Sequence, residues 1–129
     1  MTAAAVRTSR GQCAQARGIA AETLAAEALE RDGWKILARR LRTRAGEIDL
    51  VAQKSGLLAV VEVKSRRHLS EAASSVSLRQ RTRLIAAADQ ILAEHPDWGA
   101  AGMRFDILVV DAANRVRRIA DAFREGMLE

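Results

Sequence analysis

Two short segments carry charged residues at spacings that could bind a metal ion. The first segment is Gly46-Glu47-Ile48-Asp49, and the second is Glu62-Val63-Lys64. Carboxylate oxygens suit Mg²⁺ and Mn²⁺, and Mg²⁺ often takes only one or two of them, together with waters and phosphate oxygens. A lysine two positions after the second carboxylate could hold a water molecule or stabilise charge that develops on a phosphate. These residue types therefore predict metal-dependent hydrolysis of a phosphate ester.

The two segments can form one site only if the chain folds back between them. Residues 46–53 alternate as a strand does, and residues 57–65 form an apolar run typical of a central strand. Between them, Ser55-Gly56 is a hairpin turn signal. The alternation predicts Glu47 and Asp49 on one face of the first strand and its apolar residues on the other: Ile48, Leu50 and Ala52.

The length of the turn decides whether the carboxylates meet. A two-residue turn, or a four-residue loop on the same centre, places Asp49 opposite Glu62 and Glu47 opposite Lys64. Opposed residues share a face, with Cβ atoms roughly 5 Å apart. A three-residue loop would put Asp49 and Glu62 on opposite faces.

Two opposed carboxylates repel each other, which a divalent cation between them would relieve. The carbonyl oxygen of Val63 is a further candidate ligand for that cation. The alternative is a salt bridge from Lys64 to Glu62 or Glu47 on a solvated strand face, with no metal.

The remaining pattern predicts the elements that position these segments. We expect helices at 17–31 and 77–94, the second ended by Pro96, and strands at 34–43, 103–111 and near 115–119, followed by a brief segment at 121–123. Residues 66–75 are polar or small and predict a loop. The order α-β-β-β-α-β-β predicts an α/β fold in which helices flank a mixed sheet. A single domain is expected over 17–129, after a loosely ordered segment over 1–16.

Composition favours a polyanionic partner and excludes several other sites. The 129 residues carry a formal net charge of +5, from 21 Lys and Arg against 16 Asp and Glu. Most of the basic residues are arginines, whose planar fork matches phosphate oxygens, although genomic base composition is an alternative source of the bias. The single cysteine, Cys13, excludes an internal disulfide and a cysteine-based zinc site. No apolar run could span a membrane and no signal peptide is evident, so we expect a cytoplasmic protein.

Several arginines flank the two segments and could grip a DNA backbone, or could be solvated surface charges. Those before and after the segments are Arg39, Arg40, Arg42, Arg44, Arg66 and Arg67, and Arg79 lies at the start of the second predicted helix.

The pattern of Asp49 followed by Glu62-Val63-Lys64 resembles the PD-(D/E)xK nuclease superfamily, which has the restriction-endonuclease-like fold. More closely, the chain resembles the YraN-like family of small bacterial proteins. The matching segments run from residue 17 onward: Gly18-x-x-x-Glu22, Gly33-Trp34-x-Ile36-Leu37, Arg44-x-Gly46-Glu47-Ile48-Asp49-Leu50, Val61-Glu62-Val63-Lys64-x-Arg66, Arg104-Phe105-Asp106 and Ala122-Phe123.

The resemblance implies a Mg²⁺ site at Asp49 and Glu62 and a supporting role for Glu22, because the similar archaeal Holliday-junction resolvases use a glutamate on their first helix. Glu22 shares a helical stripe with small and apolar residues, although a plain surface glutamate is the alternative. The chain departs from the family by having Arg79 where a lysine usually begins the second helix, and by lacking a glycine in 68–75.

The leading hypothesis is a Mg²⁺- or Mn²⁺-dependent endonuclease that acts on DNA, possibly on branched or junction DNA. Symmetric cutting of a junction would favour a homodimer. Two alternatives remain, namely a nucleic-acid-binding module with a vestigial site and an adaptor whose carboxylates are structural.

Overall fold

The computed structural model describes residues 18–67 and 77–123, apart from the side chains of Asp121 and Phe123. Within these ranges the predicted order of helix, three strands, helix and two strands is confirmed. Residues 18–31 form the described part of the N-terminal helix. The other elements are β1 (Lys35–Thr43), β2 (Gly46–Lys54), β3 (Leu57–Ser65), α2 (Leu78–Glu94), β4 (Gly102–Val110) and β5 (Val116–Phe123). The expectations for 1–16, and most of the loop predicted at 66–75, lie outside the described residues.

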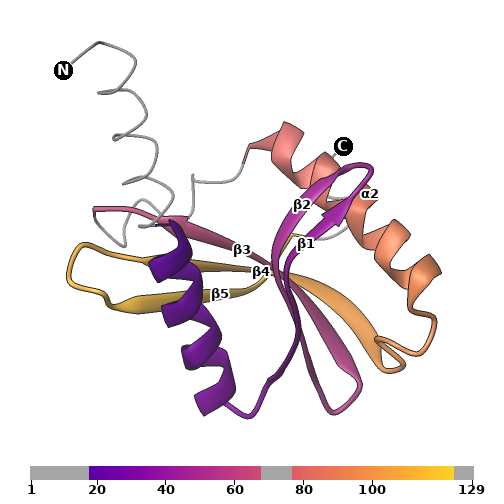
Figure 1. Ribbon diagram of the computed structural model, residues 1–129, viewed down its shortest axis with the longest axis horizontal. Coiled ribbons are helices and arrows are strands. Elements are labelled where there is room, and N and C mark those ends of the chain that lie inside the picture. Colours follow the sequence, from indigo (N-terminus) through magenta and orange to yellow (C-terminus); the bar gives the residue numbers. More distant parts are fainter. Residues whose placement is uncertain (1–17, 68–76, 124–129) are drawn as a thin grey trace, which may run out of the picture.

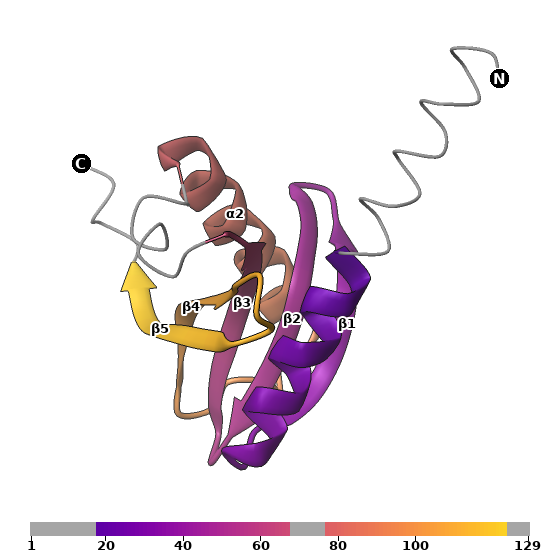
Figure 2. The same ribbon diagram turned by 90° about the vertical axis from the view of Figure 1, so that its left-hand side faces the viewer.

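The five strands form one mixed sheet in the order β1-β2-β3-β4-β5. The β3–β4 pair is parallel, and the other three neighbouring pairs are antiparallel. A parallel pair needs a crossover, which α2 provides between β3 and β4. Figures 1 and 2 show the N-terminal helix and α2 on opposite faces of the sheet. The middle strand β3 is therefore covered on both sides, as its apolar run predicted.

The core has two halves, one under each helix. Under α2, Leu84, Ala88 and Ile91 pack on residues that include Val60 and Phe105 of the sheet. Under the N-terminal helix, the side chains that pack together are Ala25, Ala26, Leu29, Trp34, Leu50, Ala52, Ala59, Val61 and Leu108. Two fully buried alanines on this helix let its backbone approach the sheet closely, which suits a core with few aromatic residues.

The β2–β3 turn is the predicted two-residue hairpin. Ser55 and Gly56 both adopt positive φ angles, 51° and 79°. Two left-handed residues in succession match the twist of the flanking strands. The paired residues run from Lys54–Leu57 to Leu50–Val61, which is the register expected for a turn on this centre. The three-residue loop is excluded.

The β1–β2 hairpin changes faces in its middle, which the regular alternation did not predict. Ile48 packs in the half of the core under α2, whereas Leu50 and Ala52 pack in the half under the N-terminal helix. The expectation that these three share one face is therefore wrong. On the neighbouring strand, Arg40 is left-handed, with a φ of 49°, between the pairs Arg39–Leu50 and Leu41–Ile48. The far end of the hairpin accordingly reaches α2, where the backbone N–H of Arg44 donates to the Gln90 side chain.

Two other details refine the predicted elements. β5 runs unbroken to Phe123, so the short strand near 115–119 and the segment at 121–123 are one strand. The pairing of β4 with β5 shifts its register between Phe105 and Ile107 and then continues to Phe123.

Helix α2 begins at a capping box between Ser77 and Gln80, and ends before Pro96. Among the described helices, none is long and apolar enough to cross a membrane.

Candidate metal and phosphate site

Glu62 and Lys64 form a buried ion pair on β3. Lys64 Nζ lies 3.1 Å from Glu62 Oε1, and the side chains are only 12% and 8% exposed. The sequence left open a salt bridge on a solvated strand face. The observed salt bridge is buried, so that alternative is wrong in its solvated setting. The second oxygen, Glu62 Oε2, is buried and has no hydrogen-bond partner among the residues that the structure describes. A buried carboxylate oxygen without a donor is costly unless a cation or a water reaches it.

Asp49 lies beside this pair and contacts β3 through its side chain. The backbone N–H of Val63 donates to Asp49 Oδ2 at 2.8 Å. Between the described strands, the pairing of β2 with β3 stops at Leu50–Val61, so neither Asp49–Glu62 nor Glu47–Lys64 is part of the ladder. The predicted register of β2 against β3 is right. Beyond Leu50–Val61, however, the Val63 N–H donates to the Asp49 carboxylate and not to a backbone carbonyl of β2. The Val63 N–H fixes one oxygen of Asp49.

The two carboxylates interact electrostatically. Burial, followed by the negative charge of Glu62, raises the pKa of Asp49 to about 7. The charge of Glu22 adds to this effect, whereas the Val63 N–H and the Lys64 ammonium oppose it. At neutral pH, Asp49 is therefore divided between its protonated and ionised forms. A divalent cation would favour the ionised form, because it neutralises the repulsion that raises the pKa.

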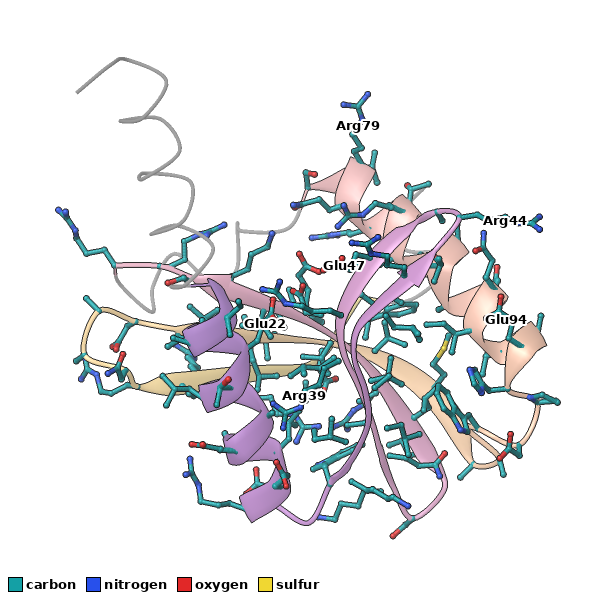
Figure 3. All side chains as sticks on the ribbon, in the orientation of Figure 1. Glu22, Arg39, Arg44, Glu47, Arg79 and Glu94 are labelled. Atoms are coloured by element: carbon teal, nitrogen blue, oxygen red, sulfur yellow. The ribbon has the colours of Figure 1, made fainter. Side chains whose placement is uncertain are left out.

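Glu22 reaches the same region from the N-terminal helix. Its side chain is 17% exposed and binds Arg40, with Arg40 Nε 2.7 Å from Oε2. Arg40 Nη2 also donates to Glu22 Oε1 at 3.4 Å. The plain surface glutamate considered from the sequence is therefore excluded. Figure 3 labels Glu22 on the N-terminal helix and Glu47 on β2, and the charges of both act on Arg40.

Glu47 sits at the edge of this group. Its side chain is 42% exposed, and Arg42 Nε lies 3.8 Å from its Oε2. Lys64, which the register placed opposite Glu47, binds Glu62 instead. Its exposure makes Glu47 a weaker candidate ligand than Glu62.

The donor set fits a hard divalent cation only in part. In residues 18–67 and 77–123, no group of three Asp, Glu, His or Cys side chains is arranged to hold a metal ion. The chemistry nevertheless suits Mg²⁺, which is often held by one or two carboxylates and keeps several waters. If a cation binds here, the unpartnered oxygen of Glu62 would be one ligand and Asp49 a second, with the Val63 carbonyl as the predicted third.

The predicted DNA-binding arginines are spread over several surfaces. Arg39 and Arg40 bind carboxylates of the N-terminal helix, with Arg39 Nη2 3.7 Å from Glu30 Oε1. Figure 3 shows Arg44 and Arg79 projecting outward, from the tip of the β1–β2 hairpin and from the first turn of α2. Arg42 and Arg67 are exposed, while the Arg66 side chain donates to the Ser65 carbonyl.

A second charged cluster joins β4, β5 and the start of β1. Asp106 has no exposed side-chain surface, and it pairs with Arg104 at 3.1 Å and with Arg118 at 2.6 Å. Both guanidinium groups lie over the Trp34 ring, 4.9 Å and 4.7 Å from its centroid. Trp34 is buried in the half of the core under the N-terminal helix. The role of Arg118 was not predicted from the sequence, although a buried aspartate implies a cation nearby.

The sequence comparisons identify relatives along most of the chain. A UPF0102 protein from Granulibacter bethesdensis is 62% identical over 115 residues, which cover 89% of this chain and 73% of the relative. A second, from Azorhizobium caulinodans, is 52% identical and covers 88% of this chain and 87% of its own length. A third, from Acidiphilium cryptum, is 46% identical, with 92% and 91% covered. Residues 21–110 match the model described as "Uncharacterised protein family UPF0102", and the chain belongs to this family.

Proposed function

We propose that this protein is a metal-dependent endonuclease that hydrolyses phosphodiester bonds in DNA. The observation that carries the proposal is the buried Glu62 Oε2 atom, which has no hydrogen-bond partner within 18–67 and 77–123 and lies in the electrostatic field of Asp49. A carboxylate pair of this kind is unfavourable in an apo-protein but suits Mg²⁺ or Mn²⁺. The likeness of Asp49 and Glu62-Val63-Lys64 to the PD-(D/E)xK pattern supports the same chemistry by analogy.

Each residue has a distinct part in this proposal. Asp49 and Glu62, with the Val63 carbonyl, would hold the cation, which on binding supplies positive charge to the scissile phosphate. Lys64 would orient the attacking water, while its salt bridge to Glu62 Oε1 leaves Oε2 for the metal. The water oxygen would bond to phosphorus and release a proton to solvent, the bond from phosphorus to the leaving ester oxygen would break, and that oxygen would take a proton from solvent. Glu22 would assist from the N-terminal helix.

DNA as the substrate rests on charge and on resemblance. The net charge of +5 and the exposed Arg42, Arg44, Arg67 and Arg79 suit a phosphate backbone. The likeness to junction resolvases favours branched DNA and, since two strands are then cut symmetrically, a homodimer.

Glu62→Gln should abolish cleavage. The amide keeps the size of the side chain but removes the charge that holds the metal, so we expect a loss of roughly hundredfold or more. The measurement is the cleavage rate on four-way-junction, flapped and single-stranded DNA with Mg²⁺ or Mn²⁺. Glu94→Gln, on the exposed surface of α2 (Figure 3), is the matched control and should keep the wild-type rate. Cleavage that survives Glu62→Gln would refute the proposed site.

Metal binding should release a proton near neutral pH. Because Asp49 has a pKa of about 7, it must lose its proton to bind a cation, and affinity should fall about tenfold for each pH unit below that value. Titration calorimetry with Mn²⁺ in buffers of different ionisation enthalpy measures both the affinity and the released protons. The titrations should cover roughly pH 5.5 to 8, a range that brackets the pKa of Asp49. A Mn²⁺ affinity that stays constant over this range would contradict the expectation.

The second candidate function is nucleic-acid binding without catalysis. It is favoured by the pairing of Glu22 with Arg40, because only Asp49 and Glu62 of the three candidate carboxylates are then available to a metal ion. This candidate predicts salt-sensitive DNA binding that survives Asp49→Ala, with no cleavage of any of the three substrates.

A further inference from the structure

Arg40 has an unusual backbone for a residue inside a strand. Its φ is 49°, and the two other described non-glycine residues with positive φ, Ser55 and Asn114, lie in turns between strands. A left-handed arginine is strained, and the surrounding contacts must offset the strain. Backbone outliers of this kind cluster at functional sites. This outlier lies next to the carboxylates of the candidate site.

The strained backbone determines where the guanidinium goes. Consecutive residues of a regular strand point to opposite faces. Arg39 and Arg40 instead both reach carboxylates of the N-terminal helix, Glu30 and Glu22 respectively. The left-handed conformation therefore directs Arg40 toward Glu22.

The guanidinium of Arg40 occupies both oxygens of Glu22 and remains open to solvent. Nε lies 2.7 Å from Oε2, and Nη2 lies 3.4 Å from Oε1. The Arg40 side chain is 37% exposed, against 17% for Glu22. A cavity of about 210 Å³ beside them is lined by Ile19, Glu22, Thr23, Arg39 and Arg40. The negative charges of Glu47 and Asp49 also act on Arg40.

We propose that Arg40 is a stand-in cation, which neutralises Glu22 in the metal-free protein and is displaced from it when a divalent cation binds at Asp49 and Glu62. The inference rests on the proposed metal site and adds its regulation. The bonds from Arg40 hold both oxygens of Glu22 and compete with a metal ion for that carboxylate. Once released beside the open cavity, the guanidinium can bind a phosphate through its two-pronged edge.

Removing Arg40 should tighten metal binding. In Arg40→Gln, we expect Mn²⁺ to bind about tenfold more tightly, because a positive charge close to the cation is lost and Glu22 becomes available. Arg39→Gln removes the same charge one residue away and frees Glu30 instead, so its affinity should change less than about threefold. Titration calorimetry with Mn²⁺ measures these affinities. Arg40→Asn, which tolerates the left-handed backbone, repeats the test if Arg40→Gln does not fold.

A double-mutant cycle tests whether the effect passes through Glu22. In a Glu22→Gln background, the tightening caused by Arg40→Gln should fall to about threefold or less, because the carboxylate that Arg40 blocks is already absent. If the wild type binds Mn²⁺ through Asp49 and Glu62 but Arg40→Gln binds it no more tightly, the stand-in role of Arg40 is wrong and the metal site stands. Absence of Mn²⁺ binding in both proteins would overturn the proposed function together with this inference.

Discussion

Asp49→Asn is expected to make the metal-free protein more stable at alkaline pH while it removes metal binding and cleavage. Asparagine keeps an oxygen that can accept the Val63 N–H, which lies 2.8 Å from Asp49 Oδ2. It carries no charge, so the repulsion from Glu62 disappears. Cleavage should fall by roughly hundredfold or more, as for loss of any essential metal ligand.

The direction of the stability change follows from proton linkage. Folding raises the pKa of Asp49 from 3.8 to about 7, so the folded state holds the proton more tightly than the unfolded state. The stability that this provides is fully present below about pH 4 and is lost as pH rises through 7. The variant has no such loss. Its advantage in free energy of unfolding should therefore grow between these pH values to a plateau on the order of 2 kcal/mol, a discounted figure because Asp49 is coupled to Glu62.

Denaturant unfolding at several pH values, with a chelator present, measures this advantage. Asp89→Asn, on the exposed surface of α2, is the matched control and should follow the wild type. Addition of Mn²⁺ should stabilise the wild type but not Asp49→Asn. If Asp49→Asn is less stable than the wild type at alkaline pH, the carboxylate is a structural group and the metal-site interpretation fails.

Asp106→Ala should destabilise the fold more than any surface substitution. The side chain has no exposed surface, and its loss leaves Arg104 and Arg118, each about one-fifth exposed, without the carboxylate that neutralises them. Removing one partner of a buried ion pair lowers the free energy of unfolding by about 3 kcal/mol or more. The Trp34 ring would retain both cations above its face but could not replace the carboxylate. Thermal or urea unfolding measures the loss.

Two further variants separate charge from packing at Asp106. Asp89→Ala should stay within about 0.5 kcal/mol of the wild type, because it removes an exposed carboxylate. Replacing the whole cluster with apolar residues, Asp106→Leu with Arg104→Met and Arg118→Met, should recover much of the loss, since no buried charge is then unpaired. A stable Asp106→Ala protein would show that the cluster contributes little.

The sequence predicted the fold well where the signals are local. The apolar run of β3 required a central strand, and Ser55-Gly56 allowed a turn of two left-handed residues. These two features set the register that brings Asp49 next to Val63 and Glu62. Proximity of the candidate ligands therefore followed from strand pairing alone.

Two other parts of the site could not be predicted from the sequence, namely the backbone of Arg40 and the packing around Glu62. Arginine has no preference for the left-handed region, so nothing in the sequence indicated that Arg40 would adopt it. The direction of Arg40 toward Glu22 depends on that conformation, and the change of faces between Ile48 and Leu50 lies beside it. The orphaned oxygen of Glu62 was equally hidden, because it depends on packing from several elements. The assigned roles of metal ligand, water-orienting lysine and DNA contacts remain predictions.

The irregular backbone of β1 also affects how the molecule meets other copies of itself. β1 is an outer strand, so one row of its N–H and C=O groups has no partner strand within the sheet. Regular, exposed edges of this kind invite cross-molecular pairing and aggregation. In β1 the row is broken twice, by the register shift between Ile36 and Ala38 and by the left-handed Arg40. The conformation that directs Arg40 toward Glu22 thus also makes this edge a poorer template for an intermolecular sheet.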